Sequence, residues 1–495
     1  MSASADTAPA RAAPSAPVGA PSGPATGPAA SCPPATDGPG DPGPDYVPVT
    51  GWGRTAPSAA RLARPRTYEE AAALVRACGR TGTRGGIARG LGRTYGDAAQ
   101  NAGGVVLDMT GLDRVHVIDA SEGLVLCDAG VSLHRLMELL LPLGWFVPVT
   151  PGTRYVTVGG AIGADIHGKN HHGAGSFSRH VLSLELLTAD GEVRTAVPGT
   201  ALFDATTGGM GLTGVILTAT VRLLPVETSL MIVDTERATD LDDLMDRLAT
   251  GDHRYRYSVA WVDLLARGAA TGRAVLTRGD HAPLDALPAR ARRRPLAFRP
   301  ARLPGAPAHV PDGLLGRGPV RLLNACWYRR APRARSGELQ GLSTFFHPLD
   351  GVPHWNRLYG RSGFVQYQFV VGDDRQGQET LRRIVARVAG HRCPSFLAVL
   401  KRFGAAGPGW LSFPAPGWTL ALDVPANLPG LGPLLDELDE QVAAAGGRVY
   451  LAKDSRLRPE LLPAMYPRLD DFRALRAELD PRGVFTSDLS RRLGL

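Results

Sequence analysis

Lysine is scarce in this chain. Only three of the 55 basic residues are lysines, namely Lys169, Lys401 and Lys453, and the other 52 are arginines. Arginine can serve for surface charge, salt bridges and phosphate contacts, whereas only lysine offers a compact amine whose pKa is readily shifted by burial. The three lysines are therefore candidate site residues, and the alternative is that they are chance survivors at the surface.

Cysteine and long apolar runs are scarce as well. The five cysteines lie far apart and form no C-x-x-C pair, so the sequence offers neither a disulfide framework nor a cysteine zinc site. No stretch approaches the ~18 consecutive apolar residues of a membrane-spanning helix, and the N-terminus lacks a basic start followed by an apolar core. We expect a cytoplasmic protein that is soluble or peripheral to a membrane.

The N-terminus also lacks aromatic residues. Residues 1–46 contain 11 of the 41 prolines and a single aromatic residue, Tyr46, which predicts a disordered tail over 1–47. The whole chain of 495 residues is 44% hydrophobic and 21% charged, which is typical of a folded protein with two or three domains. The net charge of +8 favours anionic partners, but it does not choose among nucleic acid, phosphorylated metabolites and a membrane surface.

Helical and strand patterns alternate from residue 51 onward. Apolar spacing predicts helices over 68–80 and 132–144, and a turn at Asp190-Gly191 predicts a hairpin over 180–196. Further strands and helices are expected over 103–112, 122–133, 215–225, 363–372, 379–390, 417–425 and 434–455. The alternation predicts an α+β fold. The Arg- and Pro-rich stretch 288–311 predicts a mobile basic loop, which is either a solvated linker or a binding segment for anionic lipid or substrate.

Two glycine-rich segments carry the strongest local signal. ARGLGRTYGDAAQ (88–100) and TPGTRYVTVGGAIGADIHGKNHHGAGS (150–176) let the backbone approach a ligand closely, and Arg89 and Arg93 can face a pyrophosphate. Two such loops in one domain indicate a large dinucleotide. A third motif at 209–214 matches G-x-G-x-x-G, but a β-branched strand follows it where a Rossmann site requires a helix, so we reject that site.

A histidine pair lies within the second glycine-rich segment. His167 and His171 stand four residues apart, the spacing of two metal ligands on one helix. The glycines around them disfavour a regular helix. We therefore expect no metal site.

The two glycine-rich segments resemble the FAD-cradling segments of the vanillyl-alcohol-oxidase-type flavoproteins. Within that superfamily, a series of stretches in the same order is similar to the decaprenylphosphoryl-β-D-ribose 2′-oxidase family. These stretches cover nearly everything after residue 48 and include GWGRTAPS (51–58), FFHPLD (345–350), FVQYQFV (364–370) and AKDSR (452–456).

The resemblance implies a particular domain organisation. A PCMH-type FAD-binding domain with two subdomains would occupy 48–225, and the C-terminal segment 450–495 would return to it. A substrate (cap) domain with an antiparallel sheet would occupy 226–449 and contain a mobile basic loop over 280–320.

The resemblance also implies an activity. It is the FAD-dependent oxidation of the 2′-hydroxyl of a polyprenylphosphoryl-β-D-ribose to the 2′-keto sugar, the first half of epimerisation to the arabinose donor for cell-wall arabinan. A separate NAD(P)H-dependent short-chain reductase would act on the keto product. One alternative is an FAD-dependent oxidase of another sugar, alditol or nucleoside in a specialised pathway. A nucleic-acid-binding protein is the other, and the glycine loops argue against nucleic acid as a partner.

By the same resemblance, FAD contacts fall mainly on the two glycine-rich segments. The implied residues are Ala88, Arg89, Gly90, Leu91, Gly92, Arg93, Thr94, Tyr95, Gly96, Asp97, Ala98, Gly152, Thr153, Thr157, Val158, Gly159, Gly160, Ala164, Asp165, Ile166, His167, Asn170, Ile216 and Tyr450. Many relatives carry a histidine, covalently bound to the flavin, where this chain has Arg93, so FAD should be noncovalent.

The chemistry needs a base for the sugar hydroxyl proton and cations for the lipid phosphate. All three lysines fall in active-site positions of the family, and we expect Lys453 at the reacting hydroxyl, with Lys169 and Lys401 near the phosphate and ribose oxygens. Gln366 and Gln368 share one face of a strand and would orient sugar hydroxyls, unless that face is merely half-exposed. The other expected catalytic-site residues are His167, Asp423 and Tyr95.

Three positions depart from the mycobacterial pattern of that family. Thr419 replaces an asparagine, Ala421 a cysteine and Phe346 a tyrosine, so the pocket wall has lost an amide, a thiol and a phenol. We expect the flavin chemistry to be retained. The three substitutions leave open which sugar and which lipid the pocket accepts.

Overall fold

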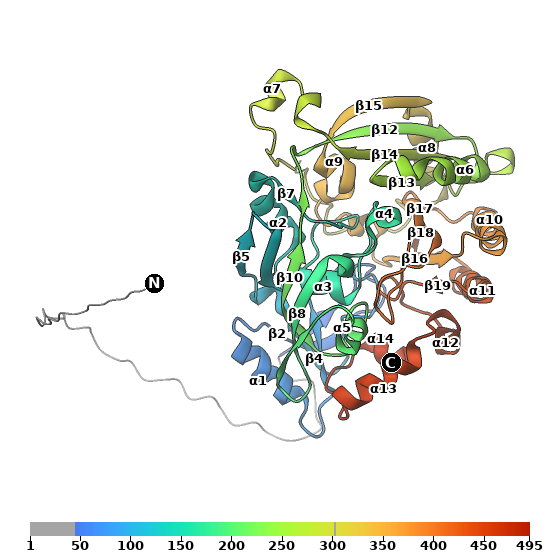
Figure 1. The fold of residues 1–495 in the computed structure, drawn as a ribbon. Coiled ribbons are helices and arrows are strands. Elements are labelled where there is room, and N and C mark those ends of the chain that lie inside the picture. The colour runs from blue at the N-terminus through green and yellow to red at the C-terminus, as the bar shows by residue number, and fades with distance from the viewer. Residues whose placement is uncertain (1–44, 301–302) are drawn as a thin grey trace, which may run out of the picture. The chain divides into compact units, whose positions relative to one another are not determined.

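The computed structural model describes residues 45–300 and 303–495, and its mixture of helices and sheets agrees with the α+β expectation (Figure 1). Nearly all of the expected tail lies outside the described residues. The expected boundary at residue 47 is wrong, because β1 (Tyr46–Val49) already pairs with β2 (Ser58–Ala63), with Tyr46 opposite Arg61. Pairing of β1 with β2 orders these residues, and amino-acid composition alone does not reveal such pairing.

The first sheet leads into the first glycine-rich segment. Its order is β1-β2-β4-β3, with β4 (Val105–Asp108) parallel to both β2 and β3 (Gly86–Arg89). Helix α1 (Tyr68–Cys78) connects β2 to β3, and the Thr67 side chain caps its N-terminus. Residues 90–98 follow β3 directly, so the sheet fixes where that loop begins.

The second sheet is antiparallel, in the order β5-β6-β10-β8-β9. The expected hairpin is confirmed, and Gly191 takes a φ of 87° at its turn. The strands and helices of this region are β5 (Val115–Asp119), β6 (Leu124–Asp128), α2 (Leu133–Leu140), β7 (Trp145–Phe146), α3 (Val158–Gly163), α4 (His171–Ala174), β8 (Val181–Leu187), β9 (Val193–Ala196), α5 (Ala201–Thr206), β10 (Val215–Arg222) and β11 (Leu224–Pro225). As expected, a strand and no helix follows the motif at 209–214.

An eight-stranded antiparallel sheet follows, in the order β15-β12-β14-β13-β17-β18-β16-β19. Its strands are β12 (Leu230–Ala238), β13 (Tyr257–Val262), β14 (Ala274–His281), β15 (Ala334–Gly341), β16 (Phe364–Val371), β17 (Ala398–Phe403), β18 (Gly417–Pro425) and β19 (Arg448–Val449). The helices between them are α6 (Leu241–Gly251), α7 (Ala289–Arg292), α8 (Arg317–Arg330), α9 (Leu342–Phe346), α10 (Arg375–His391) and α11 (Leu431–Ala444).

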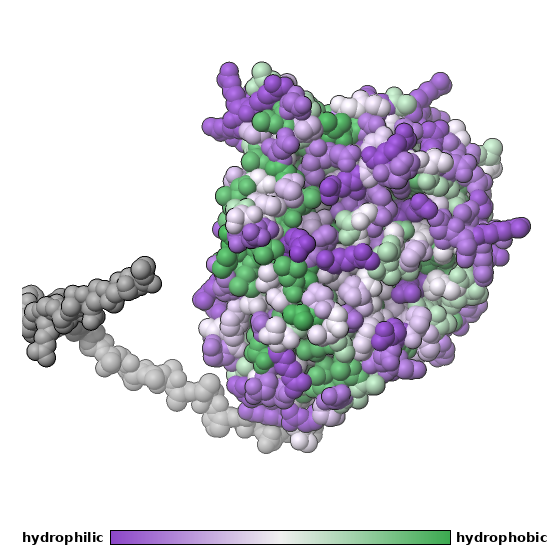
Figure 2. Space-filling model, viewed as in Figure 1, coloured by the Kyte–Doolittle hydropathy of each residue, from purple (hydrophilic) through white to green (hydrophobic). Residues whose placement is uncertain are grey.

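Residues 282–300 and 303–316 are largely irregular, and the first of these stretches contains the short helix α7 (Figure 1). Hydrogen bonds to backbone carbonyls attach both stretches to the rest of the chain. The Ser229 hydroxyl donates to the carbonyl of Ala297 at 2.7 Å, and the Ala306 amide donates to the carbonyl of Pro353 at 2.8 Å. Figure 2 shows mainly hydrophilic colour around α7, where Arg290 and Arg292 lie.

Apolar surface gathers on a different part of the same view. Figure 2 shows it along the side that carries β5 and α2, where Val117 is 53% and Leu143 is 49% exposed. In the described residues, no helix is both long enough and apolar enough to cross a bilayer.

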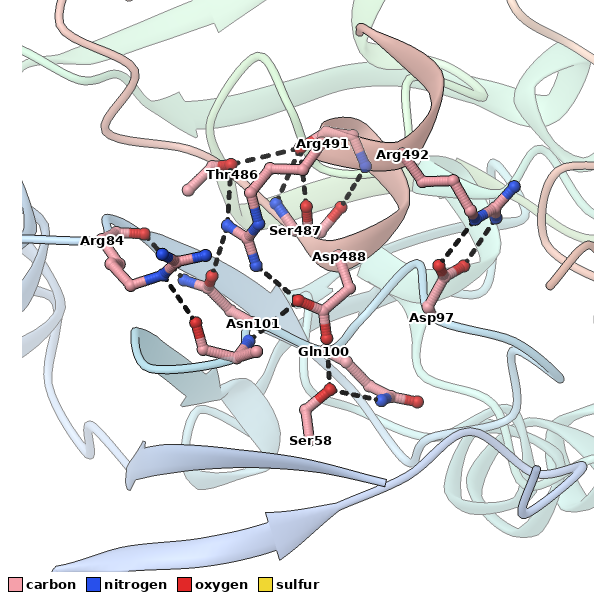
Figure 3. A network of polar contacts seen from close by, with 12 residues as sticks. Ser58, Arg84, Asp97, Gln100, Asn101, Thr486, Ser487, Asp488, Arg491 and Arg492 are labelled. Carbon is pink, nitrogen blue, oxygen red and sulfur yellow. Dashed lines mark hydrogen bonds and ion pairs between the residues drawn. The ribbon is translucent and has the colours of Figure 1, made fainter. Parts of the chain in front are cut away.

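The C-terminal segment returns to the first sheet. It contains α12 (Leu462–Met465), α13 (Leu469–Leu479) and α14 (Asp488–Leu493), and Phe485 forms a parallel bridge with Gly86 of β3. Figure 3 shows the contacts that residues 486–492 make with residues 58–101, and we call residues 484–493 the C-terminal clasp. Arg492 bonds both carboxylate oxygens of Asp97, at 2.9 and 3.0 Å, and also Asp454 at 2.8 Å.

Candidate functional site

A cavity of about 1210 Å³ lies between the glycine-rich segments and the eight-stranded sheet. Many residues among 88–95 and 150–169 line one side, and strands β16, β17 and β18 contribute to the opposite wall. The cavity is large enough for an extended ligand together with a second molecule, because drug-sized sites span about 300–1,000 Å³.

Close packing of the two glycine-rich segments shapes the cavity wall. A Cβ on Gly90 would lie only 2.2 Å from Thr157 Oγ1, so this contact requires glycine, whereas a Cβ on Gly152 would meet nothing within 4 Å. Thr94 Oγ1 is buried without a hydrogen-bond partner among the described residues and belongs to a residue that lines the cavity. A backbone cradle beside an unpaired hydroxyl fits a bound dinucleotide.

The two arginines of the first segment differ from the sequence expectation. Arg89 donates to the carbonyls of Ala99 at 3.0 Å and Thr50 at 2.8 Å, so its terminal nitrogens anchor the loop and are not free for a pyrophosphate. Arg93 stacks over Trp52 at 4.1 Å and donates to the carbonyl of Leu91. Burial lowers the pKa of both guanidinium groups.

All three lysines line this one cavity. Burial lowers the pKa of each amine to about 7, because the charged form loses solvation there. The charge of Lys401 further lowers the pKa of Lys169 and Lys453. Each amine is therefore poised between its charged and neutral forms near neutral pH.

A buried histidine links two walls of the site. This residue is His167. Its Nδ1 lies 3.1 Å from Lys401 Nζ on β17, and its Nε2 lies 2.9 Å from Gln368 Nε2 on β16. Burial, with the nearby charge of Lys401, holds the pKa of His167 well below its usual range, so the ring is neutral. With the Gln368 amide in this orientation, the neutral ring accepts at Nε2, and its Nδ1 faces the Lys401 amine.

A second group surrounds Lys453. Its Nζ lies 3.9 Å from the centre of the Tyr95 ring, and Asp423 lies behind the cavity wall, where its carboxylate accepts from Gln366 Nε2 at 2.5 Å. Burial raises the pKa of Asp423 to about 7, while its negative charge opposes the lowering of the Lys453 pKa. The amine and carboxyl therefore titrate as a coupled pair.

Lys169 occupies a different wall. Its amine contacts the carbonyl of Phe345 and lies 4.4 Å from the centre of that ring. Gln366 and Gln368 are 8% and 2% exposed, so the half-exposed alternative for this strand face does not hold.

Six of the expected site residues do not line the cavity: Gly96, Asp97, Val158, Asp165, Asn170 and Asp423. They support the residues that do. Asn170 donates to the carbonyl of Pro148 at 2.9 Å, Asp165 accepts from the Ser178 amide at 3.1 Å, and Asp97 binds Arg492 of the clasp. His167 and His171 are not on a common helix, and both rings pack against Phe403, at 4.7 and 4.4 Å between centres.

Sequence reasoning missed the wall made by α8 and β15. Leu323, Trp327, Arg330 and Arg335 line the cavity from these elements. No signal in the sequence linked this segment to the glycine loops, because the contact joins elements far apart in the chain.

Comparisons with known proteins agree with this geometry. Family models for an FAD binding domain and for D-arabinono-1,4-lactone oxidase match residues 59–196 and 374–493. The chain is 47% identical to decaprenylphosphoryl-β-D-ribose oxidase of Mycolicibacterium smegmatis, over 90% of this chain and 97% of that protein. It is 26% identical to an alditol oxidase of a Streptomyces species, over 90% of this chain and 98% of that protein.

A solved structure gives a further comparison. The BBE-like 1 protein of Physcomitrella patens matches with a TM-score of 0.62 at 16% identity, over 87% of this chain and 90% of that one. Together with the FAD family model, this likeness confirms the fold class expected from the sequence.

Proposed function

Because the chain belongs to the decaprenylphosphoryl-β-D-ribose oxidase family of FAD-dependent oxidoreductases, we propose that it oxidises the 2′-hydroxyl of a polyprenylphosphoryl-β-D-ribose to the keto sugar. The gathering of all three lysines at one cavity, opposite the FAD-type glycine segments, carries this proposal. The proposal assigns 46–225 and 450–495 to FAD binding and 226–449 to the substrate.

Lys453 is the proposed base. A neutral amine can accept the hydroxyl proton. Burial lowers the pKa of Lys453 to about 7, so the neutral form of the amine is well populated at pH 7. Residues among 88–95 and 150–168 would hold FAD, which would supply the acceptor for the hydride of the sugar carbon. Asp423 lies behind the cavity wall, where it accepts a hydrogen bond from Gln366, and its negative charge raises the pKa of Lys453.

Lys401 and Lys169 are the proposed ligands of the ribose and phosphate oxygens. The anionic phosphodiester of the substrate restores the charged form of nearby amines, because an opposite charge within about 4–6 Å favours ionisation. His167 keeps Lys401 of β17 in place, and Gln368 of β16 fixes His167. The two glutamines present amides that can bind sugar hydroxyls.

We propose that FAD is bound noncovalently, since Arg93 stands at the position of the flavin-linked histidine. Acid precipitation of the yellow protein should release the flavin into the supernatant. A pellet that keeps its colour would contradict noncovalent binding.

The function is tested with purified FAD-loaded protein and farnesylphosphoryl ribose. We expect the flavin to bleach anaerobically and mass spectrometry to show a product lighter by two hydrogens. A flavin that stays oxidised with this substrate but bleaches with a free sugar or alditol would favour the second candidate.

That second candidate is an oxidase of another sugar, alditol or nucleoside. Ala421 and Phe346, which line the cavity, motivate it, because both leave a pocket wall with fewer polar groups than the mycobacterial pattern. For the polyprenylphosphoryl-ribose substrate, the keto product requires a hydride donor to complete the epimerisation, and a separate NAD(P)H-dependent short-chain reductase is the proposed partner. A lipid-linked substrate also requires contact with a membrane surface.

A further inference from the structure

Helix α8 exposes large apolar side chains. Of its 14 residues only Val320 and Asn324 are buried, whereas Leu322 is 66%, Leu323 is 48% and Trp327 is 57% exposed. Neighbouring apolar side chains that remain in water mark an interaction surface more often than single exposed leucines do. The outer face of this helix is therefore a candidate interaction surface.

Helical spacing separates two faces of α8. Leu322 and Arg329 lie on the side opposite Val320 and Asn324, so they point away from the rest of the chain. Leu323, Trp327 and Arg330 lie between these two sides, and all three line the cavity. The exposed helix face and the cavity wall are thus continuous.

The charge around these apolar groups has one sign. Residues 317–337 contain six arginines and neither aspartate nor glutamate; the arginines are Arg317, Arg321, Arg329, Arg330, Arg333 and Arg335. An apolar face bordered by arginines, with a tryptophan at its edge, is the composition of a helix that lies in the boundary of an anionic bilayer.

We infer that α8 docks on an anionic lipid bilayer, with Leu322 in the headgroup boundary and Arg321 and Arg329 on lipid phosphates. Leu323 and Trp327 then provide an apolar path from the bilayer to the cavity. The inference deepens the proposed function, on which it rests, because it assigns the surface that a polyprenyl-linked substrate crosses. Binding to vesicles is measurable without any substrate.

The test uses the FAD-loaded full chain and vesicles of phosphatidylcholine with or without phosphatidylglycerol. The parent should sediment with the anionic vesicles, less so at high salt. Arg321→Gln and Arg329→Gln should each weaken binding about fivefold, since one arginine near such a surface contributes ~1 kcal/mol. Leu322→Glu should weaken it further. Leu62→Glu is the matched control, at a leucine of β2 that is 50% exposed, and should bind as the parent does.

Turnover with a short-chain soluble substrate should be unchanged in all four variants, because none of these side chains lines the cavity. Failure of the proposed function would remove that turnover but leave vesicle binding intact. Vesicle binding that ignores phosphatidylglycerol, or that survives all three α8 substitutions, overturns the inference. So does a parent dimer that Leu322→Glu dissociates, because a second copy of the chain would then cover α8.

Discussion

Lys453→Arg should lose most turnover, by a factor of about 10²–10⁴, while the protein still binds FAD. Guanidinium is effectively never deprotonated, so it cannot accept the hydroxyl proton. It is also larger than the ammonium that fits 3.9 Å above the Tyr95 ring, so it displaces the sugar. The measurement is the rate of anaerobic flavin bleaching after substrate is added. A variant that bleaches at nearly the parent rate would show that Lys453 is not the base.

The flavin absorbance of the variant provides the folding control. Lys169→Arg provides a comparison at the same charge, because a residue that pairs with the phosphate should raise KM more than it lowers kcat. Equal losses in kcat for both variants would argue for a shared structural role.

The pH profile tests the same assignment independently. Because the neutral amine is the active form, kcat should rise with pH through about 7 and then level off. The negative charge of Asp423 raises the pKa of Lys453, so Asp423→Asn should move this rise to lower pH. A profile that stays in place would show that Asp423 does not act on the base.

Arg492→Leu should destabilise the fold by about 3 kcal/mol and release FAD. One guanidinium binds Asp97, at the end of the first glycine-rich segment, and Asp454, next to Lys453. Its removal leaves two carboxylates of 16% and 3% exposure without their counterion. Urea unfolding and the flavin content of the purified protein measure the two effects.

Arg458→Leu is the matched control. Arg458 also pairs with a carboxylate, that of Glu440, but the two side chains are 44% and 60% exposed. An exposed pair of this kind contributes little to stability, because water screens the two charges. Equal destabilisation in both variants would refute the role assigned to Arg492.

Much of the fold could be predicted from periodicity. The strand over 417–425 coincides with β18, and the hairpin over 180–196 contains β8 and β9. Helix α8 could not be predicted, because a helix that buries only Val320 and Asn324 has no apolar stripe facing a core. Strand β1 was hidden as well, since its order comes from pairing with β2.

The candidate site was predictable where composition isolated a residue type. The excess of arginine singled out the three lysines, and the structure places all of them at one cavity. The partners that shift their pKa values were not predictable in the same way. The hydrogen bond from Gln366 to Asp423 depends on the register of β16 and β18, which pairs these residues across strands distant in sequence.

The clasp has a consequence for the order of synthesis. Asp97 and Arg492 are separated by 395 positions, so at 5–20 residues per second the ribosome makes Arg492 roughly 20–80 s after Asp97. During that interval the first glycine-rich segment exists without Arg492, and the nascent chain also lacks Lys453 for most of it. We therefore expect stable FAD binding only after translation has passed residue 492, because a shorter nascent chain lacks the contacts of the clasp with Asp97.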